Sequence, residues 1–454
     1  MRAITITRIS RWALLALFAV GTVQAQSTID PTQIEALYGL VQDGKCDELY
    51  AKLEPLTKQN ARDPDLLALE ANCRLRQARR IEQVFDSAAY ERLITGSGLR
   101  SLPASSMQSL NRVRLTHDGK GLDRALALFN EALKVAPKRD DILAGNIAAR
   151  VANGLAAPAI ELLRQRRGDI SAAVIGDTAT AVQDAASLGL VDSATKVAVA
   201  LKELFPDDPA SQGAVAVCAE ARRDFPTQLD ALRAMASLTP TDAGLAVRTA
   251  TAAGLSRQWE EALALVVPHA TVDINARFLL AQFRARRSLA SAAPLWSELG
   301  AAIAKQATPD PAMRAVIDHY LRISGSKSPP TAIMRMRGGK QLAAAGLVLP
   351  AVVELDSALA LDPKLIEAHK ALADVYRAAL RFDDALGVLD AGLAAIASLP
   401  DGASAYTQAE FQADRCAVLY GLSRDKEASA ACETARAGGH PDSMTQAMVA
   451  LAQG

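Results

Sequence analysis

The residues with the greatest capacity for chemistry in this 454-residue chain are five cysteines and five histidines. They are Cys46, Cys73, Cys218, Cys416 and Cys432, with His117, His269, His319, His369 and His440. Zinc sites in proteins use Cys and His ligands at short, paired spacings. The sequence has no Cys-x-x-Cys and no His-x-x-x-His pair. We therefore expect no metal site and no cofactor.

Other patterns typical of catalysis are also incomplete. Residues 337–340, RGGK, resemble a phosphate-binding loop, but the first glycine and the following Ser or Thr are missing. They fall on a predicted helix, which favours a structural role. The acidic pairs 260–261 and 383–384 begin predicted helices, where negative charge complements the helix dipole. No Gly-x-Ser-x-Gly elbow is present. The sequence therefore predicts a protein that is not an enzyme.

The elements that would position any site are short paired helices, and residues 366–394 show the pattern best. Leu372, Val375 and Tyr376 share one face of a first helix. Ala385 and Leu389 share one face of a second helix that begins near residue 383. Two such helices cannot bury both apolar faces without neighbours on each side. Helix pairs that stack on one another to bury such faces form a solenoid.

The same pattern recurs along the chain at a nearly constant interval. Equivalent second-helix positions are Ala125, Ala159, Ala194, Gln228 and Ala262, which are separated by 34, 35, 34 and 34 residues. This unit resembles the tetratricopeptide repeat (TPR), a helix–turn–helix of about 34 residues. The best matches are 121–137, 348–363 and 366–393. The resemblance implies an all-α, right-handed α-solenoid of about ten hairpins.

The repeats depart from the family pattern in several places. His369 stands where the family has an early Trp, and Gly392 stands where it has a late Ala. Many units lack the glycine that ends the first helix. Between Ala262 and Ala351 the spacing is 89 residues, which is not a multiple of 34.

The first 25 residues have the form of a bacterial signal peptide. Arg2, Arg8 and Arg11 precede the apolar run 12–20, and residues 23–25, VQA, fit a cleavage site before Gln26. Removing this segment takes away three Arg and no acid, which changes the net charge from 0 to −3. That near balance argues against general nucleic-acid or anionic-membrane binding. We expect a periplasmic protein, with secretion beyond the periplasm as an alternative.

The remaining chain divides into four predicted regions. Residues 26–115 form irregular N-terminal hairpins with an insertion, in which 80–95 is expected to be helical. Residues 116–323 form a central array, and 324–330, SGSKSPP, form a linker or bend. Residues 331–454 form the C-terminal repeats.

The repeat register suggests a pairing for four of the five cysteines. Cys416 and Cys432 fall on facing sides of the last antiparallel hairpin, within disulfide range. Cys46 and Cys73 fall on neighbouring helices of the first repeats, so a second bridge is expected there. Cys218 is left over as a small buried hydrophobe, with a reactive thiol as the alternative.

The family resemblance implies that the first helices line a concave groove that receives a protein or peptide segment. The positions expected to face it in the C-terminal repeats are Glu367, Lys370, Asp374, Arg377, Met336 and Lys340. The competing interpretation of each is an ordinary solvated side chain. We expect a non-enzymatic scaffold or adaptor that supports an envelope assembly or export system. A carbohydrate- or peptidoglycan-binding module and an enzyme of unknown type are the alternatives, and the oligomeric state is open.

Overall fold

The computed structural model describes residues 29–102, 110–117, 119–306, 308, 310–325, 329–399 and 405–440. The predicted signal peptide, residues 1–25, lies outside the described residues, as do positions 326–328 of the predicted linker.

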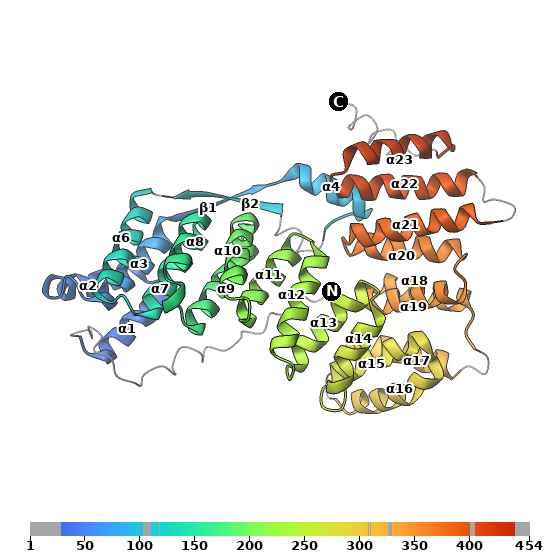
Figure 1. The fold of residues 1–454 in the computed structure, drawn as a ribbon, viewed down its shortest axis with the longest axis horizontal. Helices are drawn as coiled ribbons and strands as arrows, with labels where there is room; N and C mark the ends of the chain where they lie inside the picture. The colour runs from blue at the N-terminus through green and yellow to red at the C-terminus, as the bar shows by residue number, and fades with distance from the viewer. Residues whose placement is uncertain are drawn as a thin grey trace. The chain divides into compact units, whose positions relative to one another are not determined.

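Helices account for most of the described chain, and consecutive helices pack on one another as hairpins (Figure 1). The helices are α1 (Pro31–Gln42), α2 (Cys46–Gln59), α3 (Pro64–Ala78), α4 (Ser87–Ser97), α6 (Gly119–Val135), α7 (Asp140–Ala152), α8 (Ala156–Gln165), α9 (Ala172–Ser187), α10 (Val191–Leu204), α11 (Pro209–Ala221), α12 (Phe225–Leu238), α13 (Ala243–Leu255), α14 (Trp259–Val266), α15 (Ile274–Arg287), α16 (Leu289–Ala304), α17 (Pro311–Ser324), α18 (Ala332–Ala344), α19 (Val348–Leu361), α20 (Ile366–Ala378), α21 (Phe382–Ala397), α22 (Ala405–Gly421) and α23 (Asp425–Ala437). The predicted helical-repeat fold is confirmed, with two short strands added to it.

The turns inside the hairpins repeat one backbone conformation. A left-handed residue occurs at Gly154, Gly189, Arg223, Arg257 and Leu380, among other positions. In each case the next N–H closes the helix by bonding to the carbonyl five residues earlier, which is the Schellman arrangement. Several of these positions are not glycine, which explains why the sequence lacks the expected glycine in many units.

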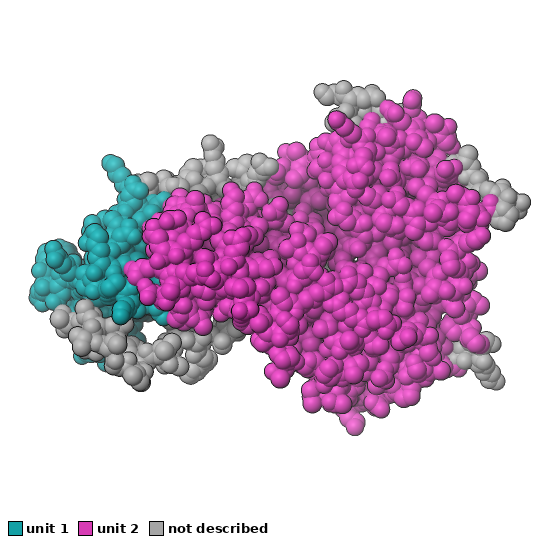
Figure 2. Space-filling model, in the orientation of Figure 1, with its two compact units in different colours: residues 1–80, 116–149 teal, residues 81–115, 150–454 magenta. Residues whose placement is uncertain are grey.

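The chain separates into two compact units (Figure 2). Unit 1 contains residues 1–80 and 116–149, and unit 2 contains 81–115 and 150–454. Unit 1 is built on a core that includes Leu37, Leu49 and Leu69. The predicted N-terminal region 26–115 is thus shared between the units.

An insertion interrupts the second repeat. Helices α3 and α6 pack against each other as a pair, although residues 79–118 separate them in sequence. The insertion holds β1 (Arg79–Phe85), α4 and β2 (Asn111–His117), and the two strands pair as a sheet. The prediction that 80–95 is helical throughout was wrong, because its first part is strand β1. Alternating apolar and polar residues in 111–117, NRVRLTH, favour a strand over a helix.

The C-terminal repeats of unit 2 fold back on earlier ones. Helix α19 packs against both α13 and α15. Buried Asp356 on α19 binds Arg257 at 2.7 Å and Arg286 at 2.6 Å. The Tyr376 hydroxyl donates to the carbonyl of Leu255 at 2.8 Å. A strict solenoid has contacts only between neighbouring repeats.

Helix α17 follows the pair α15–α16 in the chain and precedes the pair α18–α19. This unpaired helix accounts for the irregular spacing of the repeats in the sequence.

Candidate functional site

The six positions predicted to contact a partner lie on the first helices of the last repeats. Met336 and Lys340 are on α18, and the other four are on α20. Helices α18 and α20 are in contact, and ion pairs join α20 to α22. The structure therefore brings the predicted set onto one series of adjacent helices. Whether this face binds a partner stays a prediction.

The six side chains differ in how much of them solvent reaches. Lys340, Glu367 and Asp374 are exposed, and Lys370 is partly buried. Met336 is 9% exposed and packs in the core. Lys340, Glu367, Lys370 and Asp374 are therefore the members of the set that a partner can reach.

Two acids on α22 complete the charged surface of α20. The Lys370 ammonium lies 3.5 Å from Glu410 and 4.0 Å from Asp414. Arg377 lies 2.6 Å from Asp414 and 3.2 Å from Asp374. The side chain of Asp374 is 53% exposed, yet the protein atoms around its carboxyl group desolvate it and raise its pKa, whereas the positive charge of Arg377 opposes that shift. The face thus carries both signs of charge in alternation.

Sequence reasoning did not select these α22 acids, although a signal was present. Glu410 follows Glu367 by the same 43 residues that separate Ala385 from Ala428. Extending the register by one repeat would have placed Glu410 on the same face.

A pocket of about 410 Å³ opens between the start of α20 and α22. Apolar side chains and charged side chains of both signs share its wall. The lining residues are Asp362, Lys364, Leu365, Ile366, Glu367, Lys370, Thr407, Glu410 and Phe411. Two of the six predicted residues, Glu367 and Lys370, are among them. An apolar side chain of a bound segment would fit against the Leu, Ile and Phe, with its polar neighbours near the charges.

The Arg377 side chain is bound by other residues of the same chain. It is 12% exposed, and its Nε donates to the carbonyl of Gly96 on α4 at 3.1 Å. Helix α4 packs on α22 and α20 (Figure 1). The insertion therefore covers the end of the face on which Arg377 lies.

A buried charged cluster that the sequence did not reveal lies at the other side of α18. Arg335 forms an ion pair with Glu354 on α19 and donates to the carbonyl of Ala285 on α15 at 2.7 Å. His319 on α17 accepts from Arg322 through Nδ1 at 3.3 Å, since an arginine can only donate. Its Nε2 then carries the proton and faces Glu354 at 3.7 Å.

The cluster is closed by close helix packing and ring stacking. A Cβ on Gly338 would lie 2.6 Å from the His319 ring, and one on Gly339 would lie 2.6 Å from Leu355 Cγ, which explains the Gly-Gly pair in α18. Tyr320 stacks on Trp296 with ring centroids 4.4 Å apart, and burial raises the pKa of Tyr320 well above its ordinary value. These contacts join α15, α16, α17, α18 and α19, so the cluster holds these helices together.

Within the described part of the chain, no three His, Cys, Asp or Glu side chains gather as a metal site would require. The described helices also include none with the length and apolar character needed to cross a membrane.

Comparison with known proteins gives matches among solved structures only. No family model matches the chain, and no curated protein does. A tetratricopeptide repeat protein from Parabacteroides merdae is 12% identical, over 62% of this chain and 99% of that one, with a TM-score of 0.27. The P58(IPK) TPR domain is 13% identical over 74% and 93%, with a TM-score of 0.23. Human IFIT1, as a dimer with PPP-AAAA, is 15% identical over 84% and 89%, with a TM-score of 0.28.

The fold assignment rests on the 34-residue hairpins with their repeated turn. The chain has a TPR-like repeat fold. Its equivalent small residues Ala125, Ala159, Ala194 and Ala262 are all fully buried between helices, as the repeat requires.

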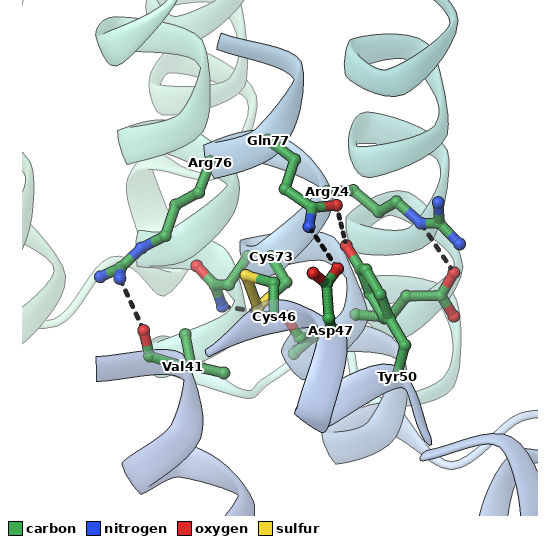
Figure 3. The surroundings of a disulfide bond; sticks show 11 residues. Val41, Cys46, Asp47, Tyr50, Cys73, Arg74, Arg76 and Gln77 are labelled. Carbon is green, nitrogen blue, oxygen red and sulfur yellow. Dashed lines mark hydrogen bonds and ion pairs between the residues drawn. A yellow bond between two sulfur atoms is a disulfide. The ribbon is translucent and has the colours of Figure 1, made fainter. Parts of the chain in front are cut away.

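Both predicted disulfides are present in this TPR-like protein. Cys46 and Cys73 are joined with Cα atoms 5.4 Å apart, and Cys416 and Cys432 with Cα atoms 5.2 Å apart. Figure 3 shows the first bridge, which links α2 to α3. Beside it, Gln77 donates to Asp47 at 3.2 Å and accepts from Tyr50 at 3.0 Å. The bridge and these side chains fasten one helix to the next.

Cys218 on α11 has no disulfide partner and is buried. Burial raises the pKa of its thiol to about 11. A thiol in this state is a weak nucleophile at neutral pH. This agrees with the expectation of a small buried hydrophobe.

Proposed function

We propose that this protein is a non-enzymatic scaffold whose face on α18, α20 and α22 binds a segment of another protein. The observation that carries the proposal is the pocket of about 410 Å³ beside Glu367 and Lys370. It combines an apolar wall with an accessible charged rim, on the face that the repeat pattern selects for contact. Such pockets take an anchoring side chain from a partner.

The chemistry of the rim defines the partner segment. Lys364 and Lys370 supply positive charge, whereas Asp362, Glu367 and Glu410 supply negative charge. A bulky apolar residue flanked by one acidic and one basic residue matches this arrangement. Mixed charge gives orientation and specificity more than affinity.

Charge reversal tests this proposal. The full chain would be immobilised and exposed to envelope extract, and Lys370→Glu would be compared with Lys426→Glu, which changes an exposed lysine on α23. Loss of the captured partner with Lys370→Glu alone supports the proposal. Equal capture by both variants and the unaltered chain rules out this face.

A carbohydrate-binding module receives less support. Such sites stack sugars on exposed aromatic rings, but Trp296 and Tyr376 are fully buried. Trp259 is covered by Arg286, whose guanidinium lies 4.9 Å from the ring centroid. A protein segment is therefore the ligand that this face favours.

We also propose that the protein is exported to the periplasm and supports an envelope assembly such as secretion, pilus formation or polysaccharide export. The leader-like sequence 1–25 and the two disulfides support export, because disulfides persist in oxidising compartments. Mass spectrometry of the protein from its native cell checks this. A first residue of Gln26 in the periplasmic fraction is expected, and an intact Met1 in the cytosol contradicts export.

A further inference from the structure

Helix α4 is not part of the repeats on which it packs. It lies in the insertion that follows α3 in the sequence, and it belongs to unit 2 together with α20 and α22, on which it packs (Figure 1). It has no place in the helix–turn–helix succession. The surface beneath it is the continuation of the face proposed above to bind a partner.

Helix α4 packs closely on α22, but few of its large apolar side chains are buried there. Leu93 is its one bulky apolar side chain that is buried, and Tyr90 and Ile94 are half-buried. Arg92 pairs with Asp425 at 2.6 Å, where both side chains remain partly exposed. Exposed pairs contribute little to stability. An isolated helix of 11 residues is also marginal in water, so α4 depends on this docking to stay ordered.

The specificity of docking comes from a glycine-to-glycine crossing. A Cβ on Gly96 would lie 3.0 Å from the Gly421 Cα and 3.1 Å from the Ala417 carbonyl oxygen. Those are backbone atoms, which cannot move aside as a side-chain end can. The ring of Phe382 closes the crossing at 3.2 Å. The crossing therefore favours a helix that has a glycine at this position.

We propose that α4 is a displaceable ligand carried by the chain itself, and that it occupies the site of a partner helix. This rests on the proposed scaffold function and names the kind of partner. The partner helix has an arginine, an apolar residue directly after it and a glycine four positions after the arginine, as Arg92, Leu93 and Gly96 do. Its arginine pairs with Asp425, and displacement of α4 frees the Arg377 guanidinium to donate to the carbonyl of the partner's glycine.

The test uses the full chain and a fluorescent peptide of residues 86–98. Gly96→Leu removes α4 from its site without touching the repeats and improves helix propensity. Leu93→Glu should also release α4, because it puts a charge at the buried position of Leu93. Gly387→Leu is the matched control, since Gly387 lies on α21 with nothing within 4 Å of its Cβ position. Hydrogen exchange reports release of 86–98, and fluorescence anisotropy reports peptide binding.

We expect the released variants to bind the peptide at least about tenfold more tightly than the unaltered chain and the control, because an attached helix competes at high effective concentration. Adding Asp425→Arg should weaken that binding, because it places two arginines together, and a peptide with Arg92→Asp should restore it. The proposal is overturned if 86–98 stays protected in both variants, or if the released variants bind no better. Either failure does not refute the proposed function of the pocket beside Lys370, since this peptide reports only on the α4 site.

Discussion

Replacing Glu354 with Gln should destabilise unit 2 by leaving a cation buried without a counter-charge. Glu354 and Arg335 are 1% and 5% exposed. Removing one partner of a buried pair costs about 3–5 kcal/mol of unfolding free energy. Arg335 keeps its bond to the Ala285 carbonyl, so the lower end of that range, about 3 kcal/mol, is expected here.

A double variant separates the charge effect from packing. Arg335→Met with Glu354→Leu removes both charges and keeps similar volume, so it should lie within about 1 kcal/mol of the unaltered chain or above it. Glu427→Gln is the control, because Glu427 forms an exposed pair with Arg424 and its loss should leave the urea midpoint unchanged.

Urea unfolding followed by tryptophan fluorescence measures these changes. The chain has three tryptophans, of which Trp12 belongs to the predicted leader, and Trp259 and Trp296 both lie in unit 2. Trp296 also stacks on Tyr320, next to the cluster. If the single and double variants lose equal stability, or if Glu354→Gln costs under 1 kcal/mol as an exposed pair would, the reasoning is wrong.

Three further changes test other parts of the structure. Ser423→Gly should raise the unfolding free energy by roughly 1 kcal/mol, because Ser423 is exposed and holds a left-handed φ of 60°; a lower melting temperature would contradict this. Replacing Cys46 and Cys73 with Ala should cost about 3 kcal/mol, and it should increase hydrogen exchange in α2 and α3; unchanged exchange would count against a stabilising bridge. At pH 8, Cys218 should resist alkylation until urea is added, since burial raises its pKa to about 11; rapid labelling of the native protein would refute its burial.

The repeats could be predicted from sequence because each unit carries its own signal. Small residues at 34-residue spacing mark where helices approach closely, and Ala159 and Ala262 are indeed fully buried. The disulfides followed from the same register, since antiparallel neighbours place Cys416 opposite Cys432. Local periodicity was sufficient for these features.

Contacts between distant residues could not be predicted in this way. Arg377 was expected to face a partner, but it binds Gly96, which lies 281 positions away. The ion pair of Arg335 with Glu354 joins two helices whose apolar patterns indicate only that both are buried. Strand β1 was missed because seven residues are too few for a clear alternation against a helical background.

The most direct test of the central claim is photo-crosslinking from two positions on neighbouring helices. A photoreactive residue would replace exposed Glu367 on α20 in one full-length protein and exposed Gly387 on α21 in another. After irradiation in the native cell envelope, we expect a discrete protein adduct from position 367 and none from 387. Adducts of equal yield from both positions, or from 387 alone, would contradict binding at this face.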